Sequence, residues 1–207
     1  MTGERDEFDR LLKKAAELRG HLCLGLSLGV RMGLMGLQLL RLEDHKSREH
    51  LVVFVENDRC LVDGIQVSTG CSAGSRRLKI FEYGKSAATF VDGRTGKGFR
   101  VSTKRSLAKD AADHTVKDTL ARQGEVVNKS SKMGREMMMN AFLKMTPEEL
   151  FGIQEVRVSL ATTFLSARSP MVRCSVCGEE IKDGRGEIQG NVTLCKACAH
   201  GAYYESL

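Results

Sequence analysis

The stretch Cys60-Leu-Val-Asp-Gly-Ile-Gln-Val-Ser-Thr-Gly-Cys71 and the earlier Gly20-His21-Leu22-Cys23 concentrate thiols and an imidazole in the first third of this 207-residue chain. The chain has seven cysteines, and the last four form a C-x2-C, x17, C-x2-C array at Cys174, Cys177, Cys195 and Cys198. That spacing is typical of a structural zinc site with four thiolate ligands. The three remaining thiols are therefore candidates for function.

Residues 60–69 form a predicted helix that follows a buried strand. The run Leu51-Val-Val-Phe-Val is β-branched and apolar, which favours a core strand. Asp58 is then the predicted N-cap of the helix, with Leu61, Val62 and Ile65 facing inward. Along a continuous helix Cys60 and Cys71 would lie about 16 Å apart, too far to share one ion. A break at Thr69-Gly70 would be needed to fold Cys71 back.

A second helix is predicted from about residue 25 to residue 42, directly after His21 and Cys23. Its glycines at positions 25, 29, 33 and 36 give it one face with almost no side chain. Such a face usually serves close helix packing, and close approach of a ligand is the alternative. Cys23 precedes this helix, where the positive end of the helix dipole favours a thiolate.

These features predict a second metal site in which His21, Cys23 and Cys60 bind one ion, expected to be zinc. Asp63 lies one turn beyond Cys60 and is a candidate to orient a ligand or to carry a proton. Cys71 is left on the loop after the helix, as a reactive thiol or a further ligand. The predicted catalytic residues are Cys60, Asp63 and Cys71.

The rest of the chain indicates an α+β core domain with an antiparallel β-sheet packed by helices, plus a small C-terminal zinc-ribbon module. An amphipathic helix with one buried apolar stripe is predicted over residues 4–18. The stripe consists of Phe8, Leu11, Leu12, Ala15 and Leu18. Short runs over 78–83, 85–92 and 98–102 predict an antiparallel meander.

Further elements complete the core domain. Helices are predicted over 106–123 and 129–144, then a capping box at Thr146 and a strand over 155–160. The predicted domains are a core over residues 1–160, a linker over 161–171 and the ribbon over 172–207.

Composition narrows the classes of function. The chain has 32 Lys and Arg against 26 Asp and Glu, a net charge of +6, but the two signs are interspersed. Aromatic residues make up 5% and Trp is absent, so a nucleic-acid stacking surface is not indicated. The first residues lack the pattern of a signal peptide, and no apolar run approaches the length of a membrane span. We expect a cytoplasmic protein with reduced or metal-bound thiols and no membrane association.

A series of short motifs resembles the FmdE family, the E-subunit family of formylmethanofuran dehydrogenase, over roughly residues 8–160. The motifs are Gly20-His21-x-Cys23, Cys60-x-x-Asp63-x-Ile65-Gln66, Thr69-Gly70-Cys71-x-x-Gly74, Tyr83-Gly84-Lys85 and Thr95-Gly96-Lys97-Gly98. The resemblance implies an α+β core with a His/Cys metal cluster in a cleft, a homodimer, and a common architecture with a zinc ribbon. By name it links the chain to the molybdenum or tungsten enzyme that fixes carbon dioxide as a formyl group, whose other subunits would be partners.

Two classes of function remain open. In the first, the chain is an enzyme or accessory subunit of one-carbon, molybdenum- or tungsten-linked redox metabolism, as an oxidoreductase subunit. The core metal ion would keep one position open for water or substrate, as catalytic sites require. In the second, it is a non-catalytic protein whose zinc ribbon docks a partner protein or nucleic acid.

Overall fold

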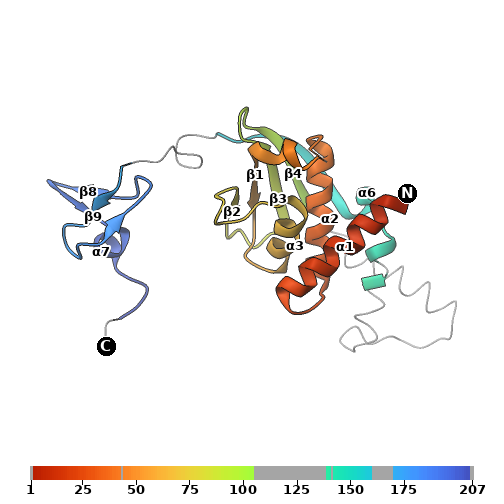
Figure 1. The fold of residues 1–207 in the computed structure, drawn as a ribbon, viewed down its shortest axis with the longest axis horizontal. Coiled ribbons are helices and arrows are strands. Elements are labelled where there is room, and N and C mark those ends of the chain that lie inside the picture. The colour runs from red at the N-terminus through yellow and green to blue at the C-terminus, as the bar shows by residue number, and fades with distance from the viewer. Residues whose placement is uncertain (1, 43, 105–138, 141, 160–169, 206–207) are drawn as a thin grey trace. The chain divides into compact units, whose positions relative to one another are not determined.

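The computed structural model describes residues 2–42, 44–104, 139–140, 142–159 and 170–205, in two compact units, Met1–Ser159 and Leu160–Leu207 (Figure 1). The first unit mixes helices with a five-stranded sheet, which confirms the predicted α+β class. Its helical elements are α1 (Thr2–Arg19), α2 (Leu24–Leu39), the 3-10 helix η1 (His45–His50), α3 (Cys60–Thr69) and α6 (Pro147–Leu150). Its strands are β1 (Leu51–Val55), β2 (Leu78–Ile80), β3 (Ala87–Asp92), β4 (Lys97–Thr103) and β5 (Phe151–Arg157).

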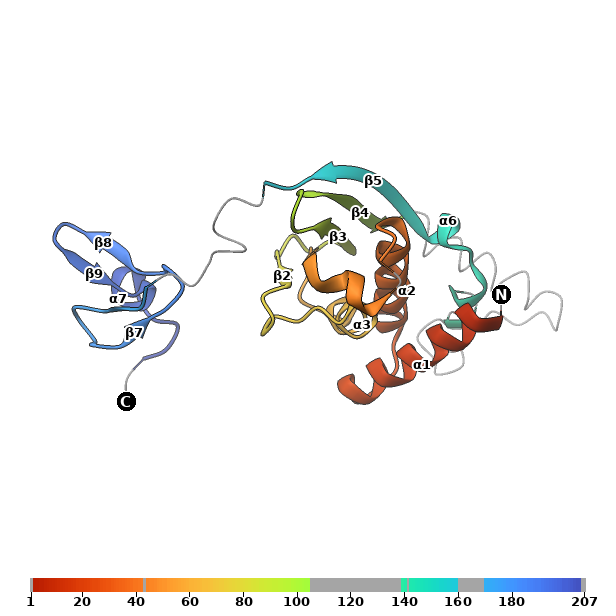
Figure 2. The ribbon, with the colours of Figure 1, turned by 45° about the horizontal axis from the view of Figure 1, so that its top comes forward.

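The sheet has the strand order β2-β1-β3-β4-β5, and Figure 2 shows α1, α2 and α3 together on one side of it. Strands β3, β4 and β5 form an antiparallel meander, and β1 pairs antiparallel with β3. The prediction that residues 78–83 belong to an antiparallel meander was wrong, because β2 pairs parallel with β1. Parallel neighbours need a long crossover, and α3 supplies it between these two strands.

Strand β1 is buried on both faces of the sheet. Its five residues are all buried, which is why the run is apolar without alternation. Beyond it, α3 begins at Cys60 and ends at Thr69, as predicted, and Gly70 caps it with φ 73°. The order β1–α3–β2 therefore places Cys60 just past the carboxyl end of a buried strand.

Glycines bring α2 and α3 into direct backbone contact. A Cβ built on Gly29 would lie 3.0 Å from the Cα of Gly64, and one on Gly64 would lie 2.7 Å from the backbone nitrogen of Val30. Real Cβ atoms essentially never come closer than 3.0 Å to such neighbours, so these positions require glycine. The glycine face therefore serves helix packing, the first of the two interpretations.

The contacts along this helix pair also set its direction. Gly25 faces Cys60, Gly29 faces Gly64, and Gly33 faces Ser68. Both helices advance together, so they are parallel and their N-termini lie at the same end. Helix α1 packs against the pair through a buried stripe of Leu11, Leu12 and Ala15. The predicted stripe extended to Leu18, which is instead 56% exposed.

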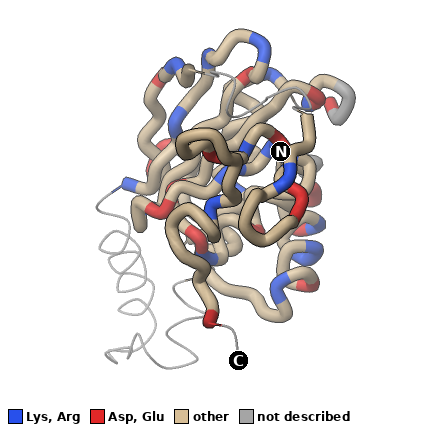
Figure 3. The backbone as a smooth tube through the Cα atoms, turned by 90° about the vertical axis from the view of Figure 1, so that its left-hand side faces the viewer, with Lys and Arg blue, Asp and Glu red and all other residues tan. Residues whose placement is uncertain are grey.

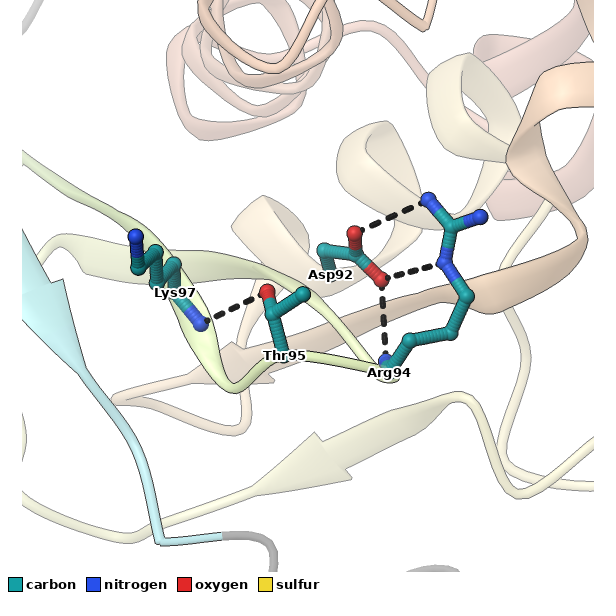
Figure 4. A network of polar contacts seen from close by, with 4 residues as sticks. All are labelled: Asp92, Arg94, Thr95 and Lys97. Carbon is teal, nitrogen blue, oxygen red and sulfur yellow. Dashed lines mark hydrogen bonds and ion pairs between the residues drawn. The ribbon is translucent and has the colours of Figure 1, made fainter.

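The β3–β4 turn is held by its own side chains (Figure 4). One carboxylate oxygen of Asp92 accepts hydrogen bonds from the backbone N–H of Arg94 at 2.9 Å and from its Nε at 3.1 Å. The other accepts from Nη2 of Arg94 at 3.0 Å. The backbone N–H of Lys97 donates to Thr95 Oγ1 at 3.2 Å, and Gly96 has φ 71°. The turn thereby fixes the register of the meander.

The segment before β5 begins with the predicted capping box. Thr146 Oγ1 accepts from the backbone N–H of Glu149 at 3.3 Å, and Glu149 Oε2 accepts from that of Thr146 at 2.6 Å. The helix predicted over 106–123 lies outside the described residues. So does the part of the helix predicted over 129–144 that precedes residue 139. The predicted linker lies outside them up to residue 169. In the parts of the chain that are described, we find no helix with the length and apolarity of a membrane span.

The second unit is a small zinc-ribbon fold. It contains the strands β6 (Val172–Arg173), β7 (Glu180–Ile181), β8 (Glu187–Gln189) and β9 (Val192–Leu194), and the helix α7 (Lys196–His200). The strands pair as two antiparallel hairpins, β6 with β7 and β8 with β9. Its buried apolar cluster consists of Cys174, Ile181 and Leu194. A core of this size needs a metal ion to hold the fold.

Candidate metal centres

The first candidate centre lies where α2 and α3 begin. Ligand atoms of His21, Cys23 and Cys60 all lie within 4.8 Å of one another. Cys23 is the N-cap of α2 and Cys60 is the first residue of α3, while His21 lies in the connection from α1. The structure thus brings together the three residues that the sequence predicts as ligands.

Two contacts fix this convergence. A Cβ on Gly25 would lie 3.3 Å from the Cβ of Cys60, so the first turns of α2 and α3 are in contact. Arg19, the last residue of α1, forms an ion pair with Asp63 of α3 at 3.5 Å. The ion pair ties the end of α1 to the first turn of α3, and the loop with His21 and Cys23 leaves from that end.

The ligand set fits a zinc ion with an open coordination position. Two thiolates on one tetrahedral zinc lie about 3.8 Å apart, given Zn–S bonds of about 2.3 Å. A group already within 4.8 Å reaches that spacing by small side-chain rotations. His21 is exposed, and Cys23 and Cys60 are half-buried. Three protein ligands leave a fourth position for water or another ligand.

Burial and the neighbouring thiol set the charge state of Cys23. Burial raises the pKa of Cys23 above its usual value, and Cys60 raises it further. The backbone N–H groups of Leu26 and Gly25 lower it. The predicted effect of the helix N-terminus is therefore present, but burial outweighs it. A bound divalent cation would reverse this balance, because a coordinating thiol is deprotonated.

Asp63 and Cys71 lie apart from the three ligands. Asp63 is absent from this group and pairs with Arg19. Cys71 is completely buried, and its Sγ lies 3.6 Å from the carbonyl oxygen of Leu51. Burial raises the pKa of its thiol. Because α3 is continuous from Cys60 to Thr69, Cys71 cannot share the ion with Cys60.

The predicted N-cap of α3 was wrong, and the residue found in its place directly precedes Cys60. The N-cap of α3 is Arg59, not Asp58. The buried Asn57 holds it, because Asn57 Oδ1 accepts from the backbone N–H of Arg59 at 3.1 Å. The Asn-Asp pair signals a turn in the sequence, but the choice between its two side chains depends on tertiary contacts.

The second candidate centre is the four-cysteine array of the ribbon, whose sulfur atoms also lie within 4.8 Å of one another. The backbone N–H of Cys195 donates to the Sγ of Cys174 at 3.3 Å, and that of Cys198 donates to the Sγ of Cys195 at 3.4 Å. Backbone hydrogen bonds lower the pKa of Cys174 to about 6, while the neighbouring sulfurs raise that of Cys198 to about 12. His200 stays outside the group and pairs with Glu187 at 2.6 Å.

Comparisons with known proteins match the two units of the chain separately, and one of them bears on the four-cysteine centre. Residues 18–152 match the family model described as "FmdE, Molybdenum formylmethanofuran dehydrogenase operon". Residues 168–204 match the model described as "Prokaryotic dksA/traR C4-type zinc finger". The fold and the two cysteine groups thus define a metal-binding protein with a C-terminal C4-type zinc finger.

The chain belongs to the FmdE family, whose model covers most of its core unit. A relative from Archaeoglobus fulgidus, named "Probable S-adenosyl-L-methionine-binding protein", is 32% identical over 97% of this chain. The alignment covers 55% of that relative, so this chain spans about half its length. An FmdE-like protein of the tungsten formylmethanofuran dehydrogenase type, from Syntrophus aciditrophicus, has a similar fold, with a TM-score of 0.65 and 19% identity. The match covers 96% of this chain and 95% of that structure.

Proposed function

We propose that this protein binds a zinc ion through His21, Cys23 and Cys60 and offers its fourth position to water or a substrate. In this proposal it acts as an enzyme or accessory subunit of one-carbon, molybdenum- or tungsten-linked redox metabolism. The observation that carries the proposal is the convergence of the three ligand atoms within 4.8 Å. The family supports the metabolic context, because its description names the formylmethanofuran dehydrogenase operon.

The chemistry of the site follows from its ligands. A zinc ion with one open position can lower the pKa of a bound water or polarise a carbonyl oxygen. The protein's own contribution is to hold the ligands at the junction of α1, α2 and α3. The exposed His21 leaves that junction accessible from solvent. Asp63 acts in this proposal as a positioning residue, through its ion pair with Arg19.

The test is a count of metal ions per chain. We expect two equivalents of zinc in the purified protein and one in Cys60→Ser. The matched control is Cys71→Ala, which alters a core cysteine outside the group and should keep two equivalents. Circular dichroism and urea unfolding would establish that each variant is folded. A single equivalent in the unmodified protein, or two in a folded Cys60→Ser variant, would contradict the proposal.

A second candidate is binding of S-adenosyl-L-methionine, favoured by the Archaeoglobus relative, which aligns with 97% of this chain. Equilibrium dialysis with labelled S-adenosyl-L-methionine would test it directly. Saturable binding that persists in Cys60→Ser would place that ligand away from the metal ion. Binding lost in Cys60→Ser but kept in Cys71→Ala would place it at the metal ion.

In the competing class, the zinc ribbon docks a partner protein or nucleic acid, and the charge of the ribbon gives little support to nucleic acid. The ribbon residues 172–207 contain four Lys and Arg and five Asp and Glu, so this module has no net positive charge to attract phosphates. Over the chain as a whole, basic and acidic residues are interspersed along the backbone (Figure 3). Retention on heparin or DNA at physiological salt would favour this competing class.

The proposal also includes partners. We expect a homodimer, and association with other subunits of a molybdenum or tungsten enzyme, on the strength of the family alone. Light scattering coupled to size-exclusion chromatography would give the mass in solution. A mass of a single chain at micromolar concentration would contradict the dimer.

A further inference from the structure

The segment Phe81–Lys85, which follows β2, is fastened to the residues that lead into Cys60. The backbone N–H of Phe81 donates to the carbonyl oxygen of Val55 at 2.8 Å, and that of Lys85 donates to the carbonyl oxygen of Glu56 at 3.0 Å. The segment therefore runs along the carboxyl end of β1. In open α/β sheets, ligands commonly bind at the carboxyl ends of the parallel strands, and β1 and β2 pair in parallel here.

Asn57 joins this segment to the metal centre. Its Nδ2 donates to the carbonyl oxygen of Lys85 at 2.8 Å, while its Oδ1 accepts from the backbone N–H of Arg59. Arg59 directly precedes Cys60. One buried side chain thus holds the end of the segment and the start of α3 at the same time.

The segment carries a row of aromatic rings that ends at the surface. The rings of Phe54 and Phe81 are 6.0 Å apart, and those of Phe81 and Tyr83 are 5.8 Å apart. Phe54 is buried, whereas Tyr83 is 63% exposed. The Lys85 Nζ lies 5.8 Å from the centre of the Tyr83 ring. The row therefore begins in the core and ends at an exposed ring with an ammonium group over it.

The charges around the row favour an anion. Arg100 neutralises the buried Glu56 carboxylate through two hydrogen bonds, at 2.6 and 2.8 Å. A zinc ion with two thiolates and a neutral imidazole has no net charge. The buried charges near the segment are therefore balanced, and its exposed charges are the Glu82 carboxylate and the Lys85 ammonium. An exposed ring and an adjacent ammonium group together recognise a flat ring by stacking and its negative group by charge.

We propose that Tyr83 and Lys85 form a binding subsite for a small molecule that carries a planar conjugated ring and a negatively charged group. This inference rests on the proposed function, because the subsite would hold such a molecule for the metal ion at His21, Cys23 and Cys60. Phe81 packs against the Tyr83 ring at a tilt of 46°, and Asn57 positions the segment. The sequence motif Tyr83-Gly84-Lys85 then has a role in recognition, with Gly84 at φ 66° providing the turn between the two side chains.

The experiment uses the full chain loaded with zinc and three probes of known chemistry. The first, 2-naphthoate, is planar and anionic, and its fluorescence reports binding. The second, 2-naphthylmethanol, keeps the ring without the charge, and cyclohexanecarboxylate keeps the charge without the planar ring. We expect saturable binding of 2-naphthoate that is about tenfold tighter than binding of either comparison probe, since each lacks one contact.

Variants assign the binding to the two residues. Tyr83→Leu and Lys85→Gln should each weaken 2-naphthoate binding about tenfold, and Tyr83→Phe should change it less than about threefold. Lys97→Gln, at the start of β4 after the β3–β4 turn, removes the same charge and should have no effect. Equal affinities in Lys85→Gln and Lys97→Gln, or no saturable binding, would overturn the inference.

Metal content measured on the same samples separates the two proposals. A protein with two zinc ions per chain that does not bind 2-naphthoate overturns the subsite and leaves the metal proposal standing. A protein with one zinc ion per chain overturns the metal proposal and, with it, the subsite's role. Because Tyr83 and Lys85 are both exposed, neither substitution removes core packing.

Discussion

Gly29 of α2 and Gly64 of α3 face each other so closely that a Cβ on Gly29 would lie 3.0 Å from the Cα of Gly64. This contact allows the two helix backbones to run side by side. Cys23 and Cys60 stand at the adjacent N-termini of those helices. The spacing of the candidate ligands Cys23 and Cys60 therefore depends on Gly29 and Gly64, which have no side chains.

We predict that Gly64→Ala separates the two helices and weakens the core metal site. The added methyl group would meet the backbone of Val30, which cannot rotate away. Overpacking of this kind costs about 3 kcal/mol in the free energy of unfolding. Urea unfolding and zinc content would measure both effects. Gly74→Ala is the control, because a Cβ there has nothing within 4 Å; equal stability of the two variants would contradict the prediction.

Removal of the Asp63 carboxylate should lower the affinity of the core site while leaving its stoichiometry intact. Asp63→Asn breaks the ion pair between Asp63 and Arg19. The side chains of Arg19 and Asp63 are 40% and 28% exposed, respectively. Exposed pairs contribute about 0.2–1 kcal/mol, so the zinc affinity should fall less than about fivefold. Competition with a chromophoric chelator gives the affinity. A complete loss of the ion would instead mean that Asp63 is a ligand.

Chelation of zinc should unfold the ribbon and spare the core unit. The ribbon has three buried apolar residues in its cluster, while the core unit has its own large apolar cluster around β1 and β3. Structural zinc contributes about 10–16 kcal/mol to the folding of zinc-finger peptides. Hydrogen exchange should show loss of protection over 172–205 and little change in β1. The Cys177→Ser variant should show the same low protection of its ribbon amides with and without the chelator. Ribbon amides of the unmodified protein that stay protected after chelation would count against a structural ion.

The Asp92–Arg94 pair should give a small dependence of stability on pH. The hydrogen bond from Arg94 lowers the pKa of Asp92 below its usual value. A lowered carboxyl pKa stabilises the folded state above about pH 4, and this contribution is lost as the pH falls through the lowered pKa. Arg94 is largely exposed, so screening by solvent should keep the effect at pH 7 small.

The measurement for this pair is urea unfolding of Asp92→Asn at pH 7 and at pH 2. The variant should be slightly less stable than the unmodified protein at pH 7, and the difference should vanish at pH 2. Glu82→Gln serves as the control for loss of an exposed carboxylate outside the turn. A constant difference at both pH values would show that the charge of Asp92 is not the cause.

Much of the local structure could be predicted from sequence. The start of α3 at Cys60, its end at Thr69 and the capping box at Thr146 all follow from local patterns of apolar, capping and breaking residues. The parallel pairing of β2 could not be predicted in this way, because a strand of three residues has no sequence pattern that specifies its partner strand. The N-cap at Arg59 was missed for a similar reason: Asn57 is fixed by its bond to Lys85, which lies 28 positions away.

The sequence by itself determined the ribbon centre. Each C-x2-C pair places two sulfurs within one turn, so the centre forms once the two pairs meet. The sequence also named the three residues that meet in the core group, His21, Cys23 and Cys60, but it left open whether Cys71 would join them. Only the tertiary structure decided that question. The parallel contact of α2 with α3 brings Cys23 to Cys60, while the unbroken length of α3 carries Cys71 into the core beside Leu51. Which helix faces meet depends on packing between distant segments, and local spacing does not encode it.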